Sequence, residues 1–234
     1  MRKFKKAFTL IELVMVIVVI AILAYNAIPD YKRNNRAEAI NHILTMIRYT
    51  QNLALHDDKH SATNTRWQHS YWRFGIYNCK NGSGLYYYIG TDNNLNGNIS
   101  QEESAIDPAN GKYMIWNRSL PCPTPNSLSN NVSPNIFITQ KYGINNVQFR
   151  SCSIMSNNNI SSSAAKHIGF DNFGRPFKSY LGNNNNNNNN TPTYSGYVRG
   201  NCTIRFDFED GSPSFTIVIP AESGFAYLQS NPSL

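Results

Sequence analysis

Hydrophobic residues are concentrated in one stretch near the start of this chain of 234 residues. Residues 8–28 read FTLIELVMVIVVIAILAYNAI, and only Thr9, Glu12 and Asn26 interrupt the apolar pattern. A run of 21 residues is long enough to cross a hydrocarbon core about 30 Å thick as an α-helix. Residues 1–7, MRKFKKA, carry four basic side chains. By the positive-inside rule we therefore expect this leader to stay in the cytoplasm and the rest of the chain to face outward.

A second periodic stretch follows the first. Pro29 is expected to kink the helix, because proline removes a backbone donor and crowds the preceding turn. The helix then resumes and ends near His56, with one apolar face that we expect to pack on a sheet. Residues 29–56 are thus predicted to be the amphipathic half of a long N-terminal helix. The apolar face consists of Ile40, Ile43, Leu44, Ile47, Ala54 and Leu55.

The pattern changes to short β-type segments in residues 57–234, which are enough for one globular unit with its own core. Turn residues Asn81–Gly84 and Asp210–Gly211 separate two pairs of strands. Prolines make residues 120–135 irregular, and the eight asparagines at 183–190 indicate a surface loop. The predicted fold class is α+β, with antiparallel sheet. The predicted strands are Tyr71–Asn78, Leu85–Gly90, Tyr113–Asn117, Ile136–Thr139, Ile144–Arg150, Thr203–Phe208 and Phe215–Ile219.

Glu12 does not belong in an ordinary membrane anchor. An unpaired carboxylate in the apolar run costs roughly 2–4 kcal/mol. One interpretation is a charge near the helix end that reaches toward the interface. The other is that Glu12 pairs with a positive group in an assembled state, and a free α-amino group at Phe8 provides one if the chain is cut after Ala7.

The basic leader followed by FTLIELVMVIVVIAILA resembles the class III signal of type IV pilins and type II secretion pseudopilins. The resemblance implies that a prepilin peptidase cuts between Ala7 and Phe8 and methylates the new N-terminus. It also implies that Glu12 aligns with the N-terminus of a neighbouring subunit during assembly. The family usually has glycine before the cut, so we expect Ala7 to permit a slower cleavage. A secretory signal peptide fits worse, because the apolar run is too long and no small-residue site closes it.

A second resemblance lies near the C-terminus. Residues 167–176, HIGFDNFGRP, resemble the strand and turn of the GspH/FimT pseudopilin domain, and residues 217–225 resemble its final strands. The match covers about 60 residues, 167–228. It implies a pilin fold, in which the long N-terminal helix packs on antiparallel sheet. The insert at 79–160 is longer than the family pattern, so we expect it to be rich in loops.

The resemblance also leaves two roles open. The first is a subunit of a type II secretion or type IV pilus filament, anchored in the bacterial inner membrane with its C-terminal part outside the cytoplasm. The second is DNA binding during competence. The formal net charge of +7 falls to about +3 without the four basic leader residues, which is weak support for nucleic-acid binding. Such binding would weaken steeply with salt. The candidate cations for DNA are Arg175, Lys178, Arg199 and Arg205.

All four cysteines lie on the side predicted to be exported. An even number of cysteines in an oxidising compartment favours two disulfides, and three connectivities are possible. We favour the sequential pairing, Cys79–Cys122 and Cys152–Cys202, which closes loops of about 40–50 residues. A zinc site is disfavoured because no C-x-x-C spacing is present.

The clearest candidate for site chemistry is the segment 92–103, DNNLNGNISQEE, which matches the loop pattern of calcium-binding EF-hands. Gly97 permits the sharp turn, and Ile99 would anchor the loop to the core. Chance is the alternative, since a chain rich in asparagine generates part of this pattern easily. With two carboxylates we expect weak, structural calcium binding, of order 10⁻⁴–10⁻³ M. The predicted ligands are Asp92, Asn94, Asn96, the carbonyl of Asn98, Ser100 through a water, and Glu103.

Other features suggest less chemistry. His56, Asp57, Asp58 and His60 lack an apolar frame, so a solvated loop is favoured over a metal site. Aromatic and basic residues at Trp67, Arg73 and 86–88 can stack on bases, but strand packing explains them more simply. The sequence contains no G-x-S-x-G, H-E-x-x-H or P-loop pattern. We therefore expect a protein that assembles with other pilins rather than an enzyme.

Overall fold

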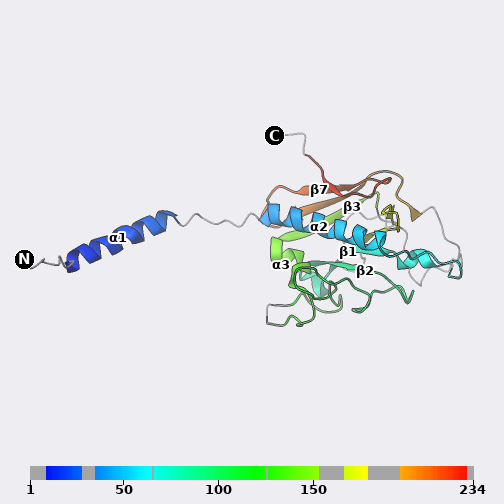
Figure 1. Cartoon of the computed structure of the whole chain (residues 1–234), viewed down its shortest axis with the longest axis horizontal. Helices are drawn as coiled ribbons and strands as arrows, with labels where there is room; N and C mark the ends of the chain where they lie inside the picture. Colours follow the sequence, from blue (N-terminus) through cyan, green and yellow to red (C-terminus); the bar gives the residue numbers. More distant parts are fainter. Residues whose placement is uncertain are drawn as a thin grey trace, which may run out of the picture. The chain divides into compact units, whose positions relative to one another are not determined.

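The computed structural model describes residues 9–27, 35–64, 66–124, 126–152, 166–178 and 196–230. The chain divides into two compact units, Met1–Asn34 (unit 1) and Asn35–Leu234 (unit 2); Figure 1 shows both. Four features discussed above lie outside the described residues: Ala7, Phe8, Pro29 and the asparagine run 183–190.

The described residues of unit 1, 9–27, form one helix, α1, which spans Leu10–Ala27. Its sequence is almost entirely apolar, and the large apolar side chains between Leu10 and Ile22 are exposed. Among the residues that the structure describes, no helix combines the length and the hydropathy needed to cross a membrane.

Helix α2, Asn35–Leu55, opens unit 2 and ends one residue before the predicted end. The buried side chains of α2 include Ile40, Ile43 and Ile47, which belong to the predicted apolar face. Residues 35–55 thus form an amphipathic helix, although Leu55 of the predicted apolar face is exposed. Residues 28–34 lie outside the described part of the chain, so one continuous helix from Phe8 to His56 stays a prediction.

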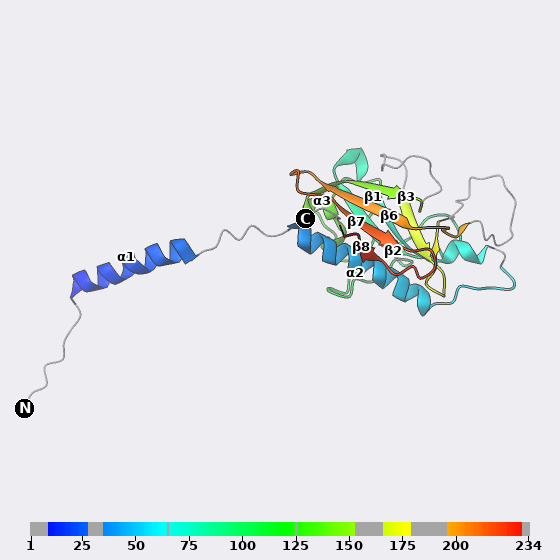
Figure 2. The same cartoon turned by 90° about the horizontal axis from the view of Figure 1, so that it is seen from above.

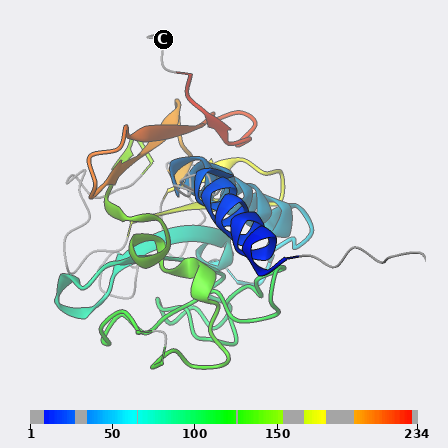
Figure 3. The same ribbon diagram turned by 90° about the vertical axis from the view of Figure 1, so that its left-hand side faces the viewer.

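Unit 2 also contains two four-stranded sheets, both antiparallel, and α2 contacts strands of both. Figures 2 and 3 show α2 alongside them from two further directions. The first sheet has the order β2-β1-β4-β5 and the second β3-β6-β7-β8. The antiparallel α+β class is therefore confirmed. The strands are β1 Trp72–Asn78, β2 Leu85–Gly90, β3 Ile144–Arg150, β4 Lys166–Phe170, β5 Pro176–Phe177, β6 Cys202–Phe208, β7 Phe215–Ile219 and β8 Tyr227–Leu228.

The β1–β2 hairpin forms where the turn residues predicted it. Asn78 pairs with Leu85, and Asn81, Gly82 and Gly84 between them all have positive φ. Glycine and asparagine tolerate this left-handed backbone better than other residues, which is why the chain reverses here. β1 then becomes a central strand, because its second edge pairs with β4.

Two predicted strands are wrong. Within 113–117 only Tyr113 forms β-bridges, to Ile106 and Val132, and both are isolated. The segment predicted as a strand at 136–139 is divided between two helical elements instead. Ile136 ends the short 3₁₀ turn η3, Pro134–Ile136, and Ile138 begins helix α3, Ile138–Tyr142. Pro134 at the start of η3 and the left-handed Gly143 after α3 are the start and stop signals of helices. These signals prevailed over the β-propensity of the apolar residues.

The main core of unit 2 joins α2 and both sheets in one cluster. From α2 it takes Ile43 and Ile47, from the first sheet Phe74, and from the second Ile204 and Ile217, all fully buried. β6 shows the alternation of buried and more exposed residues that is typical of a strand with one covered face. β2 is buried at every position, so both of its faces are covered.

Candidate functional site

The N-terminus of α1 is closed by Thr9 and Glu12. The backbone N–H and the hydroxyl of Thr9 both donate to the Glu12 carboxylate at 2.9 Å, and the N–H of Glu12 donates back to the Thr9 hydroxyl at 3.4 Å. This reciprocal arrangement is a capping box, which satisfies backbone donors that have no partner inside the helix. The signature of this box, T-L-I-E, is present in the sequence; the charge of Glu12 alone did not indicate this capping role.

Both disulfides have the sequential pairing that we predicted. Cys79 bonds to Cys122, with Cα atoms 5.2 Å apart, and Cys152 bonds to Cys202, with Cα atoms 4.8 Å apart. This pairing uses all four cysteines and leaves none as a thiolate for zinc.

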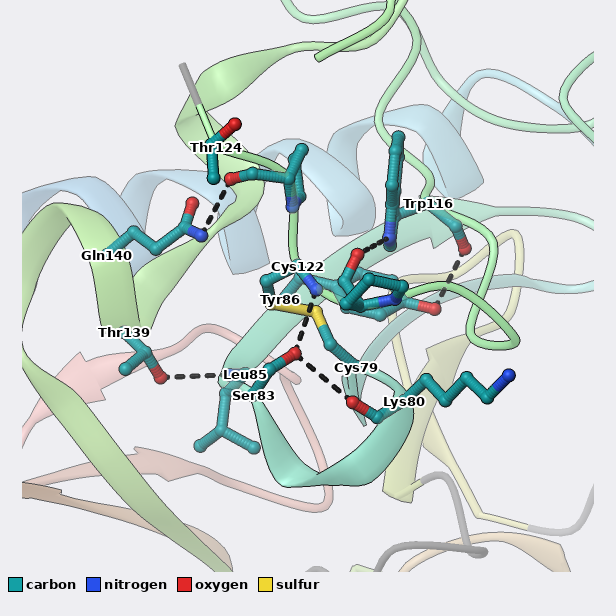
Figure 4. The surroundings of a disulfide bond; sticks show 12 residues. Cys79, Lys80, Ser83, Leu85, Tyr86, Trp116, Cys122, Thr124, Thr139 and Gln140 are labelled. Carbon is teal, nitrogen blue, oxygen red and sulfur yellow. Dashed lines mark hydrogen bonds between the residues drawn. A yellow bond between two sulfur atoms is a disulfide. The ribbon is translucent and has the colours of Figure 1, made fainter. Parts of the chain in front are cut away.

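The first disulfide ties the end of β1 to the long segment that follows β2 (Figure 4). The hydroxyl of Ser83 accepts the N–H of Cys122 at 2.9 Å, and the hydroxyl of Thr139 accepts the N–H of Leu85 at 2.8 Å. Between β2 and η3, the described residues form turns, bends and isolated bridges only. The disulfide and these hydrogen bonds therefore hold a segment that has little regular structure of its own.

Loop 92–103 folds around its own side-chain oxygens. The carboxylate of Asp92 accepts the N–H groups of Asn96 at 3.1 Å and of Gly97 at 2.9 Å. The amide oxygen of Asn94 accepts the N–H of Asn96 at 3.0 Å, and that of Asn96 accepts the N–H of Asn98 at 2.8 Å. The side chains at the first and third positions of the predicted metal loop therefore meet at the N–H of Asn96, and the fifth accepts the N–H two residues further on.

Glu103 closes the loop from the other end. Its two carboxylate oxygens accept the N–H groups of Asn94 and Ser100, each at 3.0 Å. Burial alone would raise the pKa of Glu103, but the hydrogen bonds from Ser100 and Asn94 outweigh burial and hold the pKa below its usual value. The carboxylate is therefore kept in its charged form. Ile99 packs against Gly90: a Cβ added there would lie 2.7 Å from an Ile99 methyl carbon.

A buried arginine also faces this loop, although no sequence pattern links it to residues 92–103. A guanidinium nitrogen of Arg73, on β1, lies 3.5 Å from the Asp92 carboxylate, and both residues are buried. The oxygen ligands fit a hard cation such as calcium. Arg73 already supplies positive charge to one of the two carboxylates, which lowers the attraction for a divalent ion. The residues present thus fit a site of low affinity.

The four candidate cations for DNA do not share one strand or sheet. Arg175 is held by the buried Asp171 at 2.7 Å, and Arg205, on β6 in the second sheet, lies 2.8 Å from Asp207. Residues 176–178 and 196–199 lie side by side, because the Lys178 N–H donates to the carbonyl of Gly196 and the Val198 N–H donates to the carbonyl of Pro176. Lys178 belongs to the first of these segments and Arg199 to the second. Two of the four cations therefore face carboxylates.

The structure also separates the aromatic and basic residues that the sequence grouped as a stacking surface. Tyr87 is in the main core, where its ring stacks on Phe74 at 5.5 Å between centroids. Trp67 packs edge-on against Tyr71, in a separate small cluster. Arg73, Tyr86 and Tyr88 line a pocket near loop 92–103. His56–His60 form a loop, as predicted.

Comparison with known protein families gave one match. The model described as the prokaryotic N-terminal methylation motif covers residues 2–24. The match indicates a type IV pilin-like precursor. Such a precursor is processed by prepilin peptidase and assembles with other pilins, and its N-terminal motif suggests a membrane anchor. The matched region includes Ala7, Phe8 and Glu12. Comparisons with curated proteins and with solved structures gave no match.

Proposed function

We propose that this pilin-like chain is a minor pilin or pseudopilin of the GspH/FimT type, a non-catalytic subunit of a type II secretion or type IV pilus filament. The N-terminal methylation motif carries the proposal. The subtype is supported by residues 167–176 and 217–225, whose sequence resembles that family. In unit 2 these residues form β4, the turn at Gly174 and the start of β5, and part of β7 with the loop after it.

In the proposed mechanism, prepilin peptidase cuts after Ala7 and methylates Phe8. Segment 8–28 is held in the bacterial inner membrane, and unit 2 lies outside the cytoplasm. During assembly the cationic N-terminus of one subunit meets Glu12 of its neighbour, in a charge-assisted pair that is strong where water is excluded. Before assembly, the carboxylate is occupied by Thr9 of its own helix. Assembly thus replaces a capping interaction with an ion pair between subunits.

Two substitutions separate the charge of Glu12 from its capping role. Glu12→Gln removes the charge but keeps a residue that can close a capping box, whereas Thr9→Ala weakens the cap and keeps the charge. The proposal predicts that Glu12→Gln is lost from sheared filaments of the native host while Thr9→Ala is still incorporated. Normal incorporation of Glu12→Gln, or loss of Thr9→Ala alone, would contradict it.

We further propose that loop 92–103 is a structural calcium site of low affinity. Asp92, Asn94, Asn96 and Glu103 would hold the ion with side-chain oxygens, Asn98 with its carbonyl and Ser100 through a water. The ion would neutralise the two carboxylates and stiffen the loop. The proposal is supported by the loop's fold, in which the side-chain oxygens of the first, third, fifth and twelfth positions all bind backbone N–H groups of the same loop.

The calcium proposal is tested by thermal unfolding of the full chain in detergent. Calcium at ten times its dissociation constant stabilises the folded state by about 1.4 kcal/mol, which corresponds to about 3–6 °C in Tm for a unit of this size. Glu103→Gln should abolish the shift, and Glu102→Gln, an exposed neighbour outside the ligand set, should keep it. Equal shifts in both variants, or none in the wild-type chain, would refute a site at this loop.

DNA binding in competence is the alternative role. It predicts that the full chain retards duplex DNA at low salt and releases it as salt rises. The pairing of Arg175 and Arg205 with carboxylates favours the filament role instead. Retardation that disappears in a double variant, Lys178→Gln with Arg199→Gln, would favour DNA binding.

A further inference from the structure

A pocket of about 400 Å³ opens next to loop 92–103, between the β1–β2 hairpin and residues 97–132. Its volume lies in the range of small-molecule sites. The proposed assembly segment does not contribute to it, and of the proposed calcium ligands only Asn98 lines it. Its lining includes Tyr77, Tyr86, Tyr88, Asn98, Trp116 and Arg118.

Aromatic rings form one side of this pocket. Tyr77 and Tyr88 stack with centroids 5.0 Å apart, and the Tyr86 ring lies 5.9 Å from that of Tyr77. The Tyr86 hydroxyl donates to the carbonyl of Trp116 at 2.8 Å, and the Trp116 indole N–H donates to the carbonyl of Pro121 at 3.2 Å. Figure 4 shows these two bonds beside the Cys79–Cys122 disulfide. The aromatic wall is therefore fixed in place before any ligand binds. Tyr86 and Tyr88 are buried, so the half-buried rings of Tyr77 and Trp116 are its accessible part.

The rest of the lining combines apolar side chains, Ile99, Ile115 and Val132, with polar and positively charged ones. Arg118 is exposed, and its guanidinium carbon lies 5.7 Å from the centre of the Tyr77 ring. The described residues that line the pocket include two arginines and no carboxylate. Arg73 is buried against Asp92, so Arg118 is the accessible cation of this lining. The neutral hydrogen-bonding side chains of the lining are Asn98, Gln101, Asn117 and Ser129.

We propose that this pocket binds an acidic sugar. The C–H face of a pyranose ring is apolar and can cover an aromatic wall, here that of Tyr77 and Trp116. Sugar hydroxyls both donate and accept hydrogen bonds, and amide and hydroxyl side chains offer both functions. A sugar carboxylate would pair with the guanidinium of Arg118, which matches carboxylates in two-pronged geometry.

A nucleic-acid strand fits this pocket less well, although bases also stack on aromatic rings. Its affinity comes mainly from several phosphates, each of which needs a cation. Arg118 is the single accessible cation among the described lining residues. The number of positive charges thus matches one carboxylate rather than a phosphate backbone.

The test is isothermal titration calorimetry on the full chain in detergent. The probes are tetrasaccharides that contain glucuronate, galacturonate or N-acetylneuraminate, with neutral maltotetraose and a thymidine decanucleotide for comparison. Arg118→Gln should weaken binding of the acidic probe roughly tenfold, the usual effect of losing a hydrogen bond between charged groups. Arg150→Gln, an exposed arginine on β3 in the other sheet, should leave it unchanged. Asn98→Ala should weaken acidic and neutral sugars alike.

Three results would overturn this inference: no heat with any acidic sugar at millimolar concentration, equal loss in Arg118→Gln and Arg150→Gln, or tighter binding of the decanucleotide. The inference is independent of the assembly proposal. Arg118→Gln should enter filaments normally, so failure of sugar binding and failure of assembly are separate outcomes.

Discussion

Gly224→Ala tests how the C-terminal loop is fixed to α2. Gly224 has φ +63°, and a Cβ there would lie 1.9 Å from the carbonyl oxygen of Gly174 and 2.9 Å from the side-chain nitrogen of Gln51. That nitrogen donates to the carbonyls of Gly174 at 2.9 Å and of Ser223 at 2.8 Å. Gln51 on α2 thus joins the turn after β4 to the loop after β7, and alanine at 224 would separate them.

The expected cost has two parts. A residue other than glycine in left-handed backbone costs roughly 1–2 kcal/mol, and each lost Gln51 hydrogen bond costs about 1 kcal/mol. Gly224→Ala should therefore destabilise unit 2 by about 3–4 kcal/mol, or about 10 °C in Tm. Gly211→Ala is the matched control, because Gly211 has φ +76° and a Cβ there meets nothing within 4 Å. It should cost only the backbone part, about 1–2 kcal/mol.

Near-ultraviolet circular dichroism of the full chain during heating measures both variants, because the signal follows the packing of aromatic side chains. Equal losses of Tm for Gly224→Ala and Gly211→Ala would refute the reasoning, since the junction at Gln51 would then contribute nothing measurable.

Two further predictions concern pH and disulfides. Burial lowers the pKa of His42 to about 4, so the unfolded chain takes up a proton first as the pH falls. The free energy of unfolding should therefore be unaffected above pH ~6.5 and fall by about 3 kcal/mol toward pH 4. His42→Gln should reduce this dependence of the unfolding free energy on pH, as measured by urea titrations. An unchanged pH dependence in that variant would contradict the prediction. Replacing Cys152 and Cys202 by alanine opens a 50-residue loop and should cost about 4 kcal/mol or more, because both side chains are buried. Replacing Cys79 and Cys122 by alanine should cost less stability, since Cys122 is only partly buried. A lower urea midpoint for the Cys79/Cys122 variant than for the Cys152/Cys202 variant would contradict this.

The sequence predicted elements whose signals are local. β6 and β7 were found within one residue, because alternating apolar positions and the Asp210–Gly211 turn lie in the same short segment. The end of α2 was found from its apolar face alone. Helix α3 was missed, because its five residues are rich in β-formers and only its flanking signals, Pro134 and Gly143, indicate a helix.

Features that depend on distant segments were beyond prediction. β1 pairs with β4 across about ninety residues, and no local pattern specifies that pairing. The calcium-loop pattern at 92–103 was recognised from the loop's own residues. Arg73, which lies beside Asp92, comes from β1 and is not part of that pattern. The pocket likewise joins Tyr77 to Trp116 and Arg118, which only the fold brings together. Sequence therefore identified the candidate ligands, and the structure identified what surrounds them.

The mass and N-terminal chemistry of the protein from native membranes test the central claim most directly. The account predicts a chain that begins at N-methylated Phe8, with residues 1–7 removed. A chain that keeps Met1–Ala7 would contradict it: the α-amino group at Phe8 would not exist, Glu12 would have no cationic partner in a neighbouring subunit, and assembly by this route would fail.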